Sequence, residues 1–324
     1  MGFERKHRKP LCLNRRLQTL AMIAACLSLT ACVGISASEL NSIGSKLTPV
    51  DINFAELETY AERSRAAYGA TAAIKAKYPK TVRISTPGGT GVRYFLELDD
   101  KARTQIITVR GTADQKNFSE DLNITVRTDR QADIPVDAGF DRAARAVYSD
   151  AKSHLKRGYK TYVTGHSLGG AVAALITIYA IEDGFSVERV ITFGQPRFTT
   201  AAGVQRLRLP LIRVVDENDI IPMLPPATAT DPAYGPYEHV GPEVILLQGQ
   251  HYVYLPAHDA TRIDVGEFWR TIGIADLPDH KISRYVNRIA DKINRAEQVA
   301  YNQRERYVGA QSNMQPVPNY ATQR

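Results

Sequence analysis

The 324-residue sequence predicts an α/β fold, with a mostly parallel central sheet flanked by helices. The composition is that of a globular protein, with 44% hydrophobic and 23% charged residues, so the chain can bury a sizeable core. From residue 160 onward, short β-prone runs alternate with an apolar helical segment. A serine flanked by glycines lies at one of these strand-to-helix junctions. These three observations favour a single domain.

The spacing of apolar residues predicts the individual elements. Strands are predicted at 81–85, 92–98, 105–109, 161–163, 190–193 and 211–215, followed by a hairpin of 244–247 and 252–255 that turns at Gly249. Helices are predicted at 54–68, 138–155, 168–181 and 280–299. After residue 160 the order strand, helix, strand, strand is typical of a parallel sheet.

The first 31 residues have the pattern of a secretory signal peptide. A basic stretch ends at Arg16, and a mostly apolar run follows that is too short to span a bilayer. The run closes with Leu29-Thr30-Ala31-Cys32, which resembles the lipobox of bacterial lipoproteins. This resemblance implies an exported protein that lipidated Cys32 anchors in the cell envelope, and Val33 resembles the pattern of outer-membrane sorting. Cleavage nearby, after Ser38, would instead release a secreted protein.

The rest of the chain divides into three parts. Residues 32–50 are small and polar and predict a tether. A single domain over 51–300 accounts for all the elements predicted above. Residues 301–324 are polar and contain two prolines, which predicts a disordered tail.

The charge distribution argues against a nucleic-acid partner, and the cysteine positions argue against an internal disulfide. Six of the 41 basic and one of the 34 acidic residues lie in the leader, so 35 basic and 33 acidic residues remain. No dense basic stripe is left, and we expect no nucleic-acid partner. Cys12, Cys26 and Cys32 are the three cysteines, so the processed chain would have no internal disulfide. We expect neither a metal nor an organic cofactor.

The segment Gly165-His166-Ser167-Leu168-Gly169 matches the G-x-S-x-G pattern of a nucleophile elbow, between a predicted strand and a predicted helix. Such a sharp turn strains the serine backbone, and the two glycines must lack side chains to avoid clashes. The helix N-terminus adds partial positive charge, and the Leu168 N–H points to where an oxyanion would form. The pattern predicts an α/β-hydrolase fold with Ser167 as nucleophile, and His166 pointing away from it.

Four segments in chain order resemble the class 3 (fungal-type) lipase family over roughly residues 54–290. They are Arg110-Gly111-Thr112, the elbow with Gly170, Phe193-Gly194-Gln195-Pro196-Arg197 and Asn218-Asp219-Ile220-Ile221-Pro222. The resemblance implies a serine hydrolase that cleaves carboxylic esters of lipids through an acyl-enzyme intermediate. It also implies Thr112 as the second oxyanion donor beside Leu168. The alternative for Thr112 is a plain strand-end threonine.

A serine nucleophile needs an imidazole to take its proton and a carboxylate to orient that imidazole. In this fold the chain order is serine, acid, histidine. Asp216 and Asp219 both follow the strand predicted at 211–215. Asp219 stands at the family's acid position, and Asp216 is expected to be a solvated loop carboxylate.

Four histidines follow Asp219 in the chain. His280 resembles the family's catalytic histidine, which lies before the last helix with a tyrosine shortly after it. His239 resembles a second family histidine with a structural role. His239, His251 and His258 remain alternatives to His280 as the base.

The segment that often forms an apolar lid in this family is mostly polar here. Residues 113–122 have Phe118 where the family usually has Trp. We therefore expect weak interfacial activation, and lipase, esterase and phospholipase A activities all stay open. The expected function is hydrolysis of lipid esters at a membrane. The alternative is a catalytically silent envelope lipoprotein that keeps the lipase fold as a binding module, which the complete Ser–Asp–His set disfavours.

Overall fold

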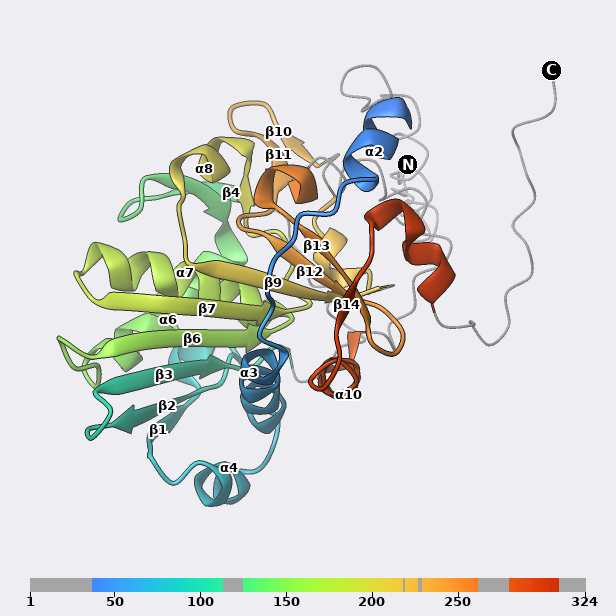
Figure 1. Ribbon diagram of the computed structural model, residues 1–324. Helices are drawn as coiled ribbons and strands as arrows, with labels where there is room; N and C mark the ends of the chain where they lie inside the picture. The colour runs from blue at the N-terminus through green and yellow to red at the C-terminus, as the bar shows by residue number, and fades with distance from the viewer. Residues whose placement is uncertain (1–36, 113–124, 218, 227–228, 262–279, 309–324) are drawn as a thin grey trace, which may run out of the picture. The chain divides into compact units, whose positions relative to one another are not determined.

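The computed structural model describes residues 37–112, 125–217, 219–226, 229–261 and 280–308 (Figure 1). Its main sheet has nine strands in the order β1-β2-β3-β6-β7-β9-β12-β13-β14. Their bounds are β1 Thr81–Ser85, β2 Tyr94–Asp99, β3 Thr104–Val109, β6 Lys160–His166, β7 Ser186–Phe193, β9 Leu211–Asp216, β12 Glu243–Leu246, β13 His251–Leu255 and β14 Glu297–Gln298.

The centre of this sheet is parallel. β3, β6, β7, β9 and β12 pair in parallel with one another along the sheet. β1 and β2 join antiparallel at one edge, and β13 pairs antiparallel with β12 to form the predicted late hairpin. The predicted mostly parallel sheet is therefore confirmed. Parallel strands end together, so the loops after β3, β6, β7 and β9 meet at one edge.

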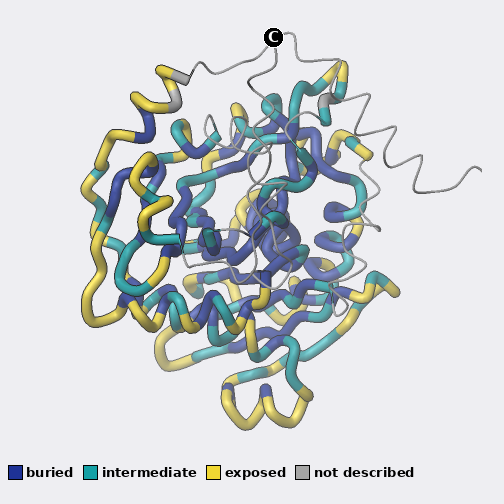
Figure 2. Tube along the Cα trace, turned by 90° about the vertical axis from the view of Figure 1, so that its right-hand side faces the viewer, coloured by how far each residue is buried: buried dark blue, intermediate teal, exposed yellow. Residues whose placement is uncertain are grey.

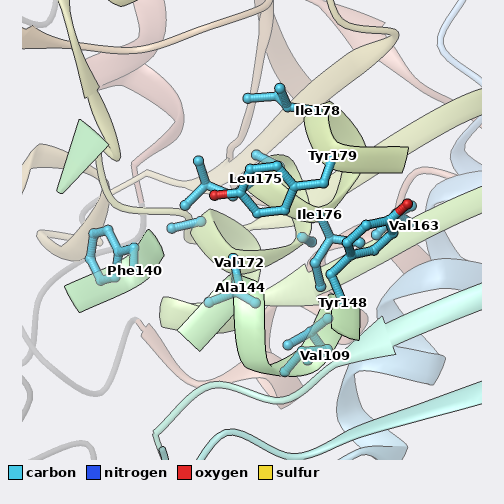
Figure 3. Packing of buried hydrophobic residues seen from close by; sticks show 14 of the residues in the cluster. Val109, Phe140, Ala144, Tyr148, Val163, Val172, Leu175, Ile176, Ile178 and Tyr179 are labelled. Atoms are coloured by element: carbon cyan, nitrogen blue, oxygen red, sulfur yellow. The ribbon is translucent and has the colours of Figure 1, made fainter. Parts of the chain in front are cut away.

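Helices cover both faces of the sheet (Figure 1). On β7, Val190 packs in one hydrophobic cluster, and its neighbour Ile191 packs in another, as the two-residue period of a strand requires. The first cluster lies under α6 (Ala138–Lys152) and α7 (Leu168–Glu182), and Figure 3 shows its side chains. The second lies under α3 (Phe54–Ala66) and α10 (Ile282–Ala290). In Figure 2 the buried residues gather inside these layers.

The helix α7 is apolar on nearly all sides because it is enclosed. Twelve of its fifteen residues are buried, including Val172, Leu175 and Ile176. An all-round apolar helix is typical of a fully buried element. The helix that begins at the elbow is thus fixed within the core (Figure 3).

A second sheet, which periodicity did not predict, flanks the first. Its strands are short, and it runs in the order β10-β11-β8-β5-β4. The bounds are β4 Val126–Asp129, β5 Ile134–Asp137, β8 Thr199–Thr200, β10 Thr230–Asp231 and β11 Gly235–Glu238. Smaller elements are α4 Thr71–Lys77, η1 Pro87–Gly89, α8 Ala201–Arg206 and η3 Ile221–Met223. Strands of two to four residues carry too few positions to show an alternating pattern.

The last helix is shorter than predicted. The sequence predicts a helix over 280–299, but α10 ends at Ala290. Two residues later the ammonium of Lys292 turns inward and donates to the carbonyls of Leu247, Gly249 and Arg288. Glu297–Gln298 then pairs with β13 as β14. These contacts outweigh the helical preference of the segment.

Two expected boundaries also differ from the structure. The predicted tether contains a helix, α2 (Ala37–Gly44), whose Ile43 is buried in a cluster with Leu247 and Val253. The predicted tail begins with a 3-10 helix, η5 (Tyr301–Tyr307), and Tyr301 is buried in the same cluster. Both segments therefore pack on the domain.

Some predictions concern residues outside the described ranges. These are the signal peptide over 1–31, lipidated Cys32 and the polar segment 113–122. In the part of the chain that is described, no helix combines the length and the apolar character needed to cross a bilayer.

Candidate active site

Ser167 occupies a strained turn between β6 and α7. Its φ and ψ are 61° and −137°, a backbone conformation that is costly for a residue with a side chain. The turn is held on both sides: the Ser167 N–H donates to the Phe193 carbonyl at 2.9 Å, and the Gly170 N–H donates to the Ser167 carbonyl at 2.8 Å. The bond to Phe193 fastens the serine to the carboxyl end of β7.

The glycines of the elbow are required by close backbone contacts. A Cβ at Gly165 would lie 2.2 Å from the Gly169 carbonyl oxygen, and a Cβ at Gly169 would lie 2.5 Å from that of Val109. No side chain tolerates such distances to backbone atoms. The predicted steric need for both glycines is therefore confirmed.

The structure brings Asp219 and His280 together. His280 Nδ1 lies 2.7 Å from Asp219 Oδ2, and both side chains are almost fully buried. The same oxygen accepts a hydrogen bond from the Tyr285 hydroxyl at 2.5 Å, and Asp219 Oδ1 accepts one from the Ile221 N–H at 2.9 Å. Burial opposes the charged carboxylate, but the electrostatic interaction with the His280 ring and these hydrogen bonds outweigh it and lower the pKa of Asp219. The acid therefore stays ionised.

The second ring nitrogen of His280 is left available. An ionised carboxylate only accepts, so His280 Nδ1 carries the proton and the neutral ring has its lone pair at Nε2. That nitrogen is buried and has no hydrogen-bond partner among the described residues. A buried imidazole oriented by a carboxylate, with a free lone pair, can act as a base.

Gly194 places this acid–histidine pair at the end of β7. The glycine has a φ of 55°, and a Cβ there would lie 2.8 Å from Asp219 Oδ2 and 2.9 Å from His280 Cε1. The residue before it, Phe193, accepts the Ser167 N–H. The serine turn and the Asp219–His280 pair thus both lie against the carboxyl end of one strand.

His166, which the sequence predicts to point away from the serine, packs against His280. Its ring stacks on His280, with ring centroids 4.6 Å apart. Its Nε2 lies 2.7 Å from the His280 carbonyl oxygen, and its Nδ1 lies 2.8 Å from the Tyr68 hydroxyl. Burial first, and then the nearby His280, lower the pKa of His166 to about 3.

The expectation of a solvated Asp216 is wrong. The carboxylate is fully buried and pairs with Arg284, while Arg288 lies 3.6 Å away. Burial raises the pKa of Asp216 to about 7 despite both guanidinium groups. These two arginines also bind Glu217, so they fasten the loop after β9 to α10. Asp216 is therefore a structural partner of the helix that follows His280.

The three histidines that the sequence left as alternatives to His280 make other contacts. The buried His239 ring approaches the Pro222 carbonyl at 2.7 Å, which ties it to the loop after Asp219. His251 stacks on Tyr307, with ring centroids 3.9 Å apart. The His258 side chain is 77% exposed. His280 is the histidine whose ring contacts Asp219.

The two expected oxyanion donors come from different segments near the serine. Leu168 is the first residue of α7, and the first N–H groups of a helix have no partner within it. Gly111 precedes Thr112 and packs against the elbow, since a Cβ there would lie 2.8 Å from Ser167 Cβ. Thr112 is half-buried and directly follows the residue that packs against the serine.

Sequence reasoning missed Tyr68 as part of this site. Tyr68 lies just past α3, 98 residues before His166 in the chain, and carries no local signal of that contact. No group of three or more His, Cys, Asp or Glu side chains within the described ranges could hold a metal ion.

A mostly parallel sheet with a strained serine between β6 and α7 defines the α/β-hydrolase fold. Residues 106–229 match the family model of the class 3 lipases. The chain is 31% identical over 170 residues to secreted mono- and diacylglycerol lipase 1 of Fusarium solani, covering 49% of each chain. It is 33% identical over 158 residues to a lipase of Rhizomucor miehei, covering 44% of this chain and 42% of the other. It therefore spans about half the length of these relatives.

Solved structures show the same fold. The R. miehei lipase in its propeptide complex matches with a TM-score of 0.54 at 23% identity, over 76% of this chain and 80% of that one. Lip2 lipase from Yarrowia lipolytica matches with a TM-score of 0.54 at 18% identity, over 73% and 95%. The sequence matches support the resemblance to class 3 lipases, and the solved structures show the shared fold.

Proposed function

We propose that this protein is a serine hydrolase that cleaves carboxylic esters of lipids. Ser167 is the nucleophile, His280 the general base and Asp219 the group that orients the imidazole. The observation that carries the proposal is the buried Asp219–His280 pair, whose free Nε2 lies at the same strand end as the strained serine turn. The backbone N–H groups of Thr112 and Leu168 stabilise the oxyanion.

The reaction proceeds in two balanced steps. Ser167 Oγ attacks the ester carbonyl carbon while His280 Nε2 takes its proton, and the imidazolium then protonates the leaving alcohol. Water next attacks the acyl-enzyme and gives one proton to His280, which passes it to Ser167 Oγ as the ester bond to the serine breaks and the carboxylic acid leaves. The ionised Asp219 stabilises the imidazolium in both steps. Each oxyanion donor contributes about 3 kcal/mol of transition-state stabilisation.

The substrate class follows from the relatives. The name of the Fusarium solani lipase specifies mono- and diacylglycerols for that protein. We propose acylglycerols as the first substrates to test, with phospholipids and short-chain esters beside them. Initial rates on matched panels of monoester, phospholipid and triglyceride rank these classes.

Labelling with a fluorophosphonate probe tests the nucleophile. Wild type should be labelled and should hydrolyse a short-chain nitrophenyl ester. Ser167→Ala should lose both properties while keeping its circular dichroism spectrum. Ser186→Ala, at the exposed start of β7, is the matched control and should behave as wild type. Absence of labelling in a folded wild-type protein would overturn the enzyme proposal and leave a binding module.

We further propose that the protein is exported and that lipidated Cys32 anchors it in the envelope. The name of the Fusarium solani relative describes that protein as secreted. Multiple acyl chains give stable membrane binding, whereas one alone is marginal. The full chain should enter the detergent phase on Triton X-114 partitioning, and Cys32→Ser should move to the aqueous phase. Retention of the variant in the detergent phase would refute the anchor.

A further inference from the structure

A line of hydrogen bonds runs beneath the site outside the proposed triad. Tyr68, just beyond α3, contacts His166 of the elbow, and His166 contacts the backbone of His280. At its other end the Tyr68 hydroxyl packs against Gly111, since a Cβ there would lie 2.6 Å from it, beside the oxyanion donor Thr112. Four segments far apart in the chain thus meet through two side chains.

The chemistry of the partners assigns the protons along this line. The His280 carbonyl can only accept, so His166 Nε2 carries a proton and donates it. The buried His166 ring is neutral, so its Nδ1 has a lone pair and accepts from the Tyr68 hydroxyl. Burial raises the pKa of Tyr68 and keeps it a phenol. Each polar atom of the line therefore has one defined role.

This arrangement holds His280 in a way that Asp219 alone does not. Asp219 fixes the imidazole ring through Nδ1, whereas His166 fixes the backbone of the same residue. His166 is covalently joined to Ser167, so a single hydrogen bond sets the spacing between nucleophile and base. The residue that it holds lies 114 positions away in the chain.

The neutral state of His166 also matters for the charge that forms during catalysis. The two imidazole rings stack with centroids 4.6 Å apart. A second positive charge at that distance would oppose the His280 imidazolium, because like charges repel strongly where water is excluded. A neutral ring provides contact without that repulsion.

We propose that Tyr68 and His166 are a pair of positioning residues that set His280 against Ser167 and align the Gly111–Thr112 oxyanion segment. This inference rests on the proposed function, because it assigns roles relative to the same nucleophile and base. The pair touches no reacting atom. Its effect should appear in the rate of the chemical step rather than in substrate affinity.

Variants of the pair test the proposal on an ester that wild type hydrolyses, with rates normalised to active sites titrated by a fluorophosphonate. Tyr68→Phe removes one hydroxyl and should lower kcat about tenfold with KM within twofold, the effect expected of one positioning hydrogen bond. Tyr60→Phe, a buried tyrosine within α3, is the matched control and should keep wild-type kcat.

Substitution of the histidine separates positioning from packing. His166→Phe keeps an aromatic ring but loses both hydrogen bonds and should lower kcat about 100-fold. His166→Gln restores a donor and an acceptor and should recover at least tenfold of that loss. The double variant Tyr68→Phe/His166→Phe should be no slower than His166→Phe, because both changes break the same line.

The outcomes are distinct. If Tyr68→Phe retains kcat within twofold of wild type, or if His166→Gln is as slow as His166→Phe, the positioning pair is rejected while the Ser167 mechanism stands. If Ser167→Ala remains as active as wild type, the proposed function itself fails. Should His166→Phe not fold, Tyr68→Phe and His166→Gln still decide the question.

Discussion

The Asp219 carboxylate and the His280 imidazole meet at 2.7 Å although 61 positions separate them in the chain. Asp219 comes from the loop after β9, and His280 lies two residues before α10. Tyr285, in the second turn of α10, donates to the same carboxylate oxygen. The loop before α10 and the helix itself thus each supply one donor to the same buried oxygen, and such donors allow a charge to remain ionised away from water.

Removal of the Asp219 charge should impair catalysis far more than folding. Asp219→Asn keeps the shape of the side chain but loses the acceptor that holds the His280 tautomer. We expect kcat to fall on the order of 10³- to 10⁴-fold with KM little changed. Steady-state kinetics on a short-chain ester, with active sites titrated, measure the effect.

Asp216→Asn is the matched control, since Asp216 is an equally buried carboxylate three residues earlier, at the end of β9. Its partners are Arg284 and Arg288 rather than a histidine. We expect lower stability in urea and a kcat within tenfold of wild type. Equal losses of kcat in the two variants would contradict the assignment of Asp219 as the orienting acid.

Loss of the Tyr285 hydroxyl should have a smaller effect on the same group. Tyr285→Phe leaves His280 in contact with Asp219 but removes one of the hydrogen bonds that lower the Asp219 pKa. We expect kcat to fall about tenfold, because one hydrogen bond to a charged group contributes ~1.5 kcal/mol or more. Tyr252→Phe, whose hydroxyl donates to Val50, is a control remote from the site. A Tyr285→Phe enzyme as fast as wild type would exclude this role.

Periodicity predicted the central layers because each strand and helix buries a continuous apolar face. The elements at 54–66, 104–109 and 168–182 are long enough to show that pattern, and they appear within a few residues of their expected bounds. The second sheet was missed because Thr199–Thr200 and Thr230–Asp231 pair only through tertiary contacts. The last helix was predicted too long, because the pairing of β14 and the burial of Lys292 act across the chain.

The site residues likewise fall into those that the sequence predicted and those that it did not. The local steric pattern around Ser167 predicted the elbow, since Gly165 and Gly169 lie within two residues of it. The acid was inferred from strand order and resemblance, and the structure brings it to His280 as expected. The partners Tyr68 and His166 could not be inferred, because nothing near either residue indicates a contact spanning 98 positions. Asp216 was misjudged because it belongs to β9 rather than to the loop, and the arginines that cover it lie far along the chain.

The elbow glycines offer a steric test with an internal control. Gly165→Ala would place a Cβ 2.2 Å from a backbone oxygen, and we expect a loss of about 3 kcal/mol or more of stability and loss of activity. Gly170→Ala would meet only side-chain carbons of Gln195 and Thr192, at 3.0 Å and beyond. That change should be mild, because alanine also favours the helix by about 1 kcal/mol.

Urea unfolding followed by circular dichroism measures both variants, and nitrophenyl ester hydrolysis follows the active site. Similar stability losses for Gly165→Ala and Gly170→Ala would show that the backbone contact at Gly165 is not the constraint. A stable but inactive Gly165→Ala protein would mean that the turn relaxes and moves Ser167.

The low pKa of His166 makes the free energy of unfolding depend on pH. In the folded protein His166 stays neutral down to about pH 3, because burial disfavours its charged form. The unfolded chain takes up this proton near pH 6.5, so it binds more protons than the folded chain between these values. Stability therefore falls as the pH drops through this window. The contribution of His166 between pH 7 and pH 5 is about 2 kcal/mol.

His166→Gln removes this titration, so its loss of stability between pH 7 and pH 5 should be about 2 kcal/mol smaller than that of wild type. The comparison of slopes isolates His166, since the other titrating groups, including buried His239, are common to both proteins. Urea unfolding at the two pH values measures both proteins. A wild-type slope in His166→Gln would mean that His166 is protonated in the fold, which would reverse the direction assigned to its hydrogen bond with Tyr68.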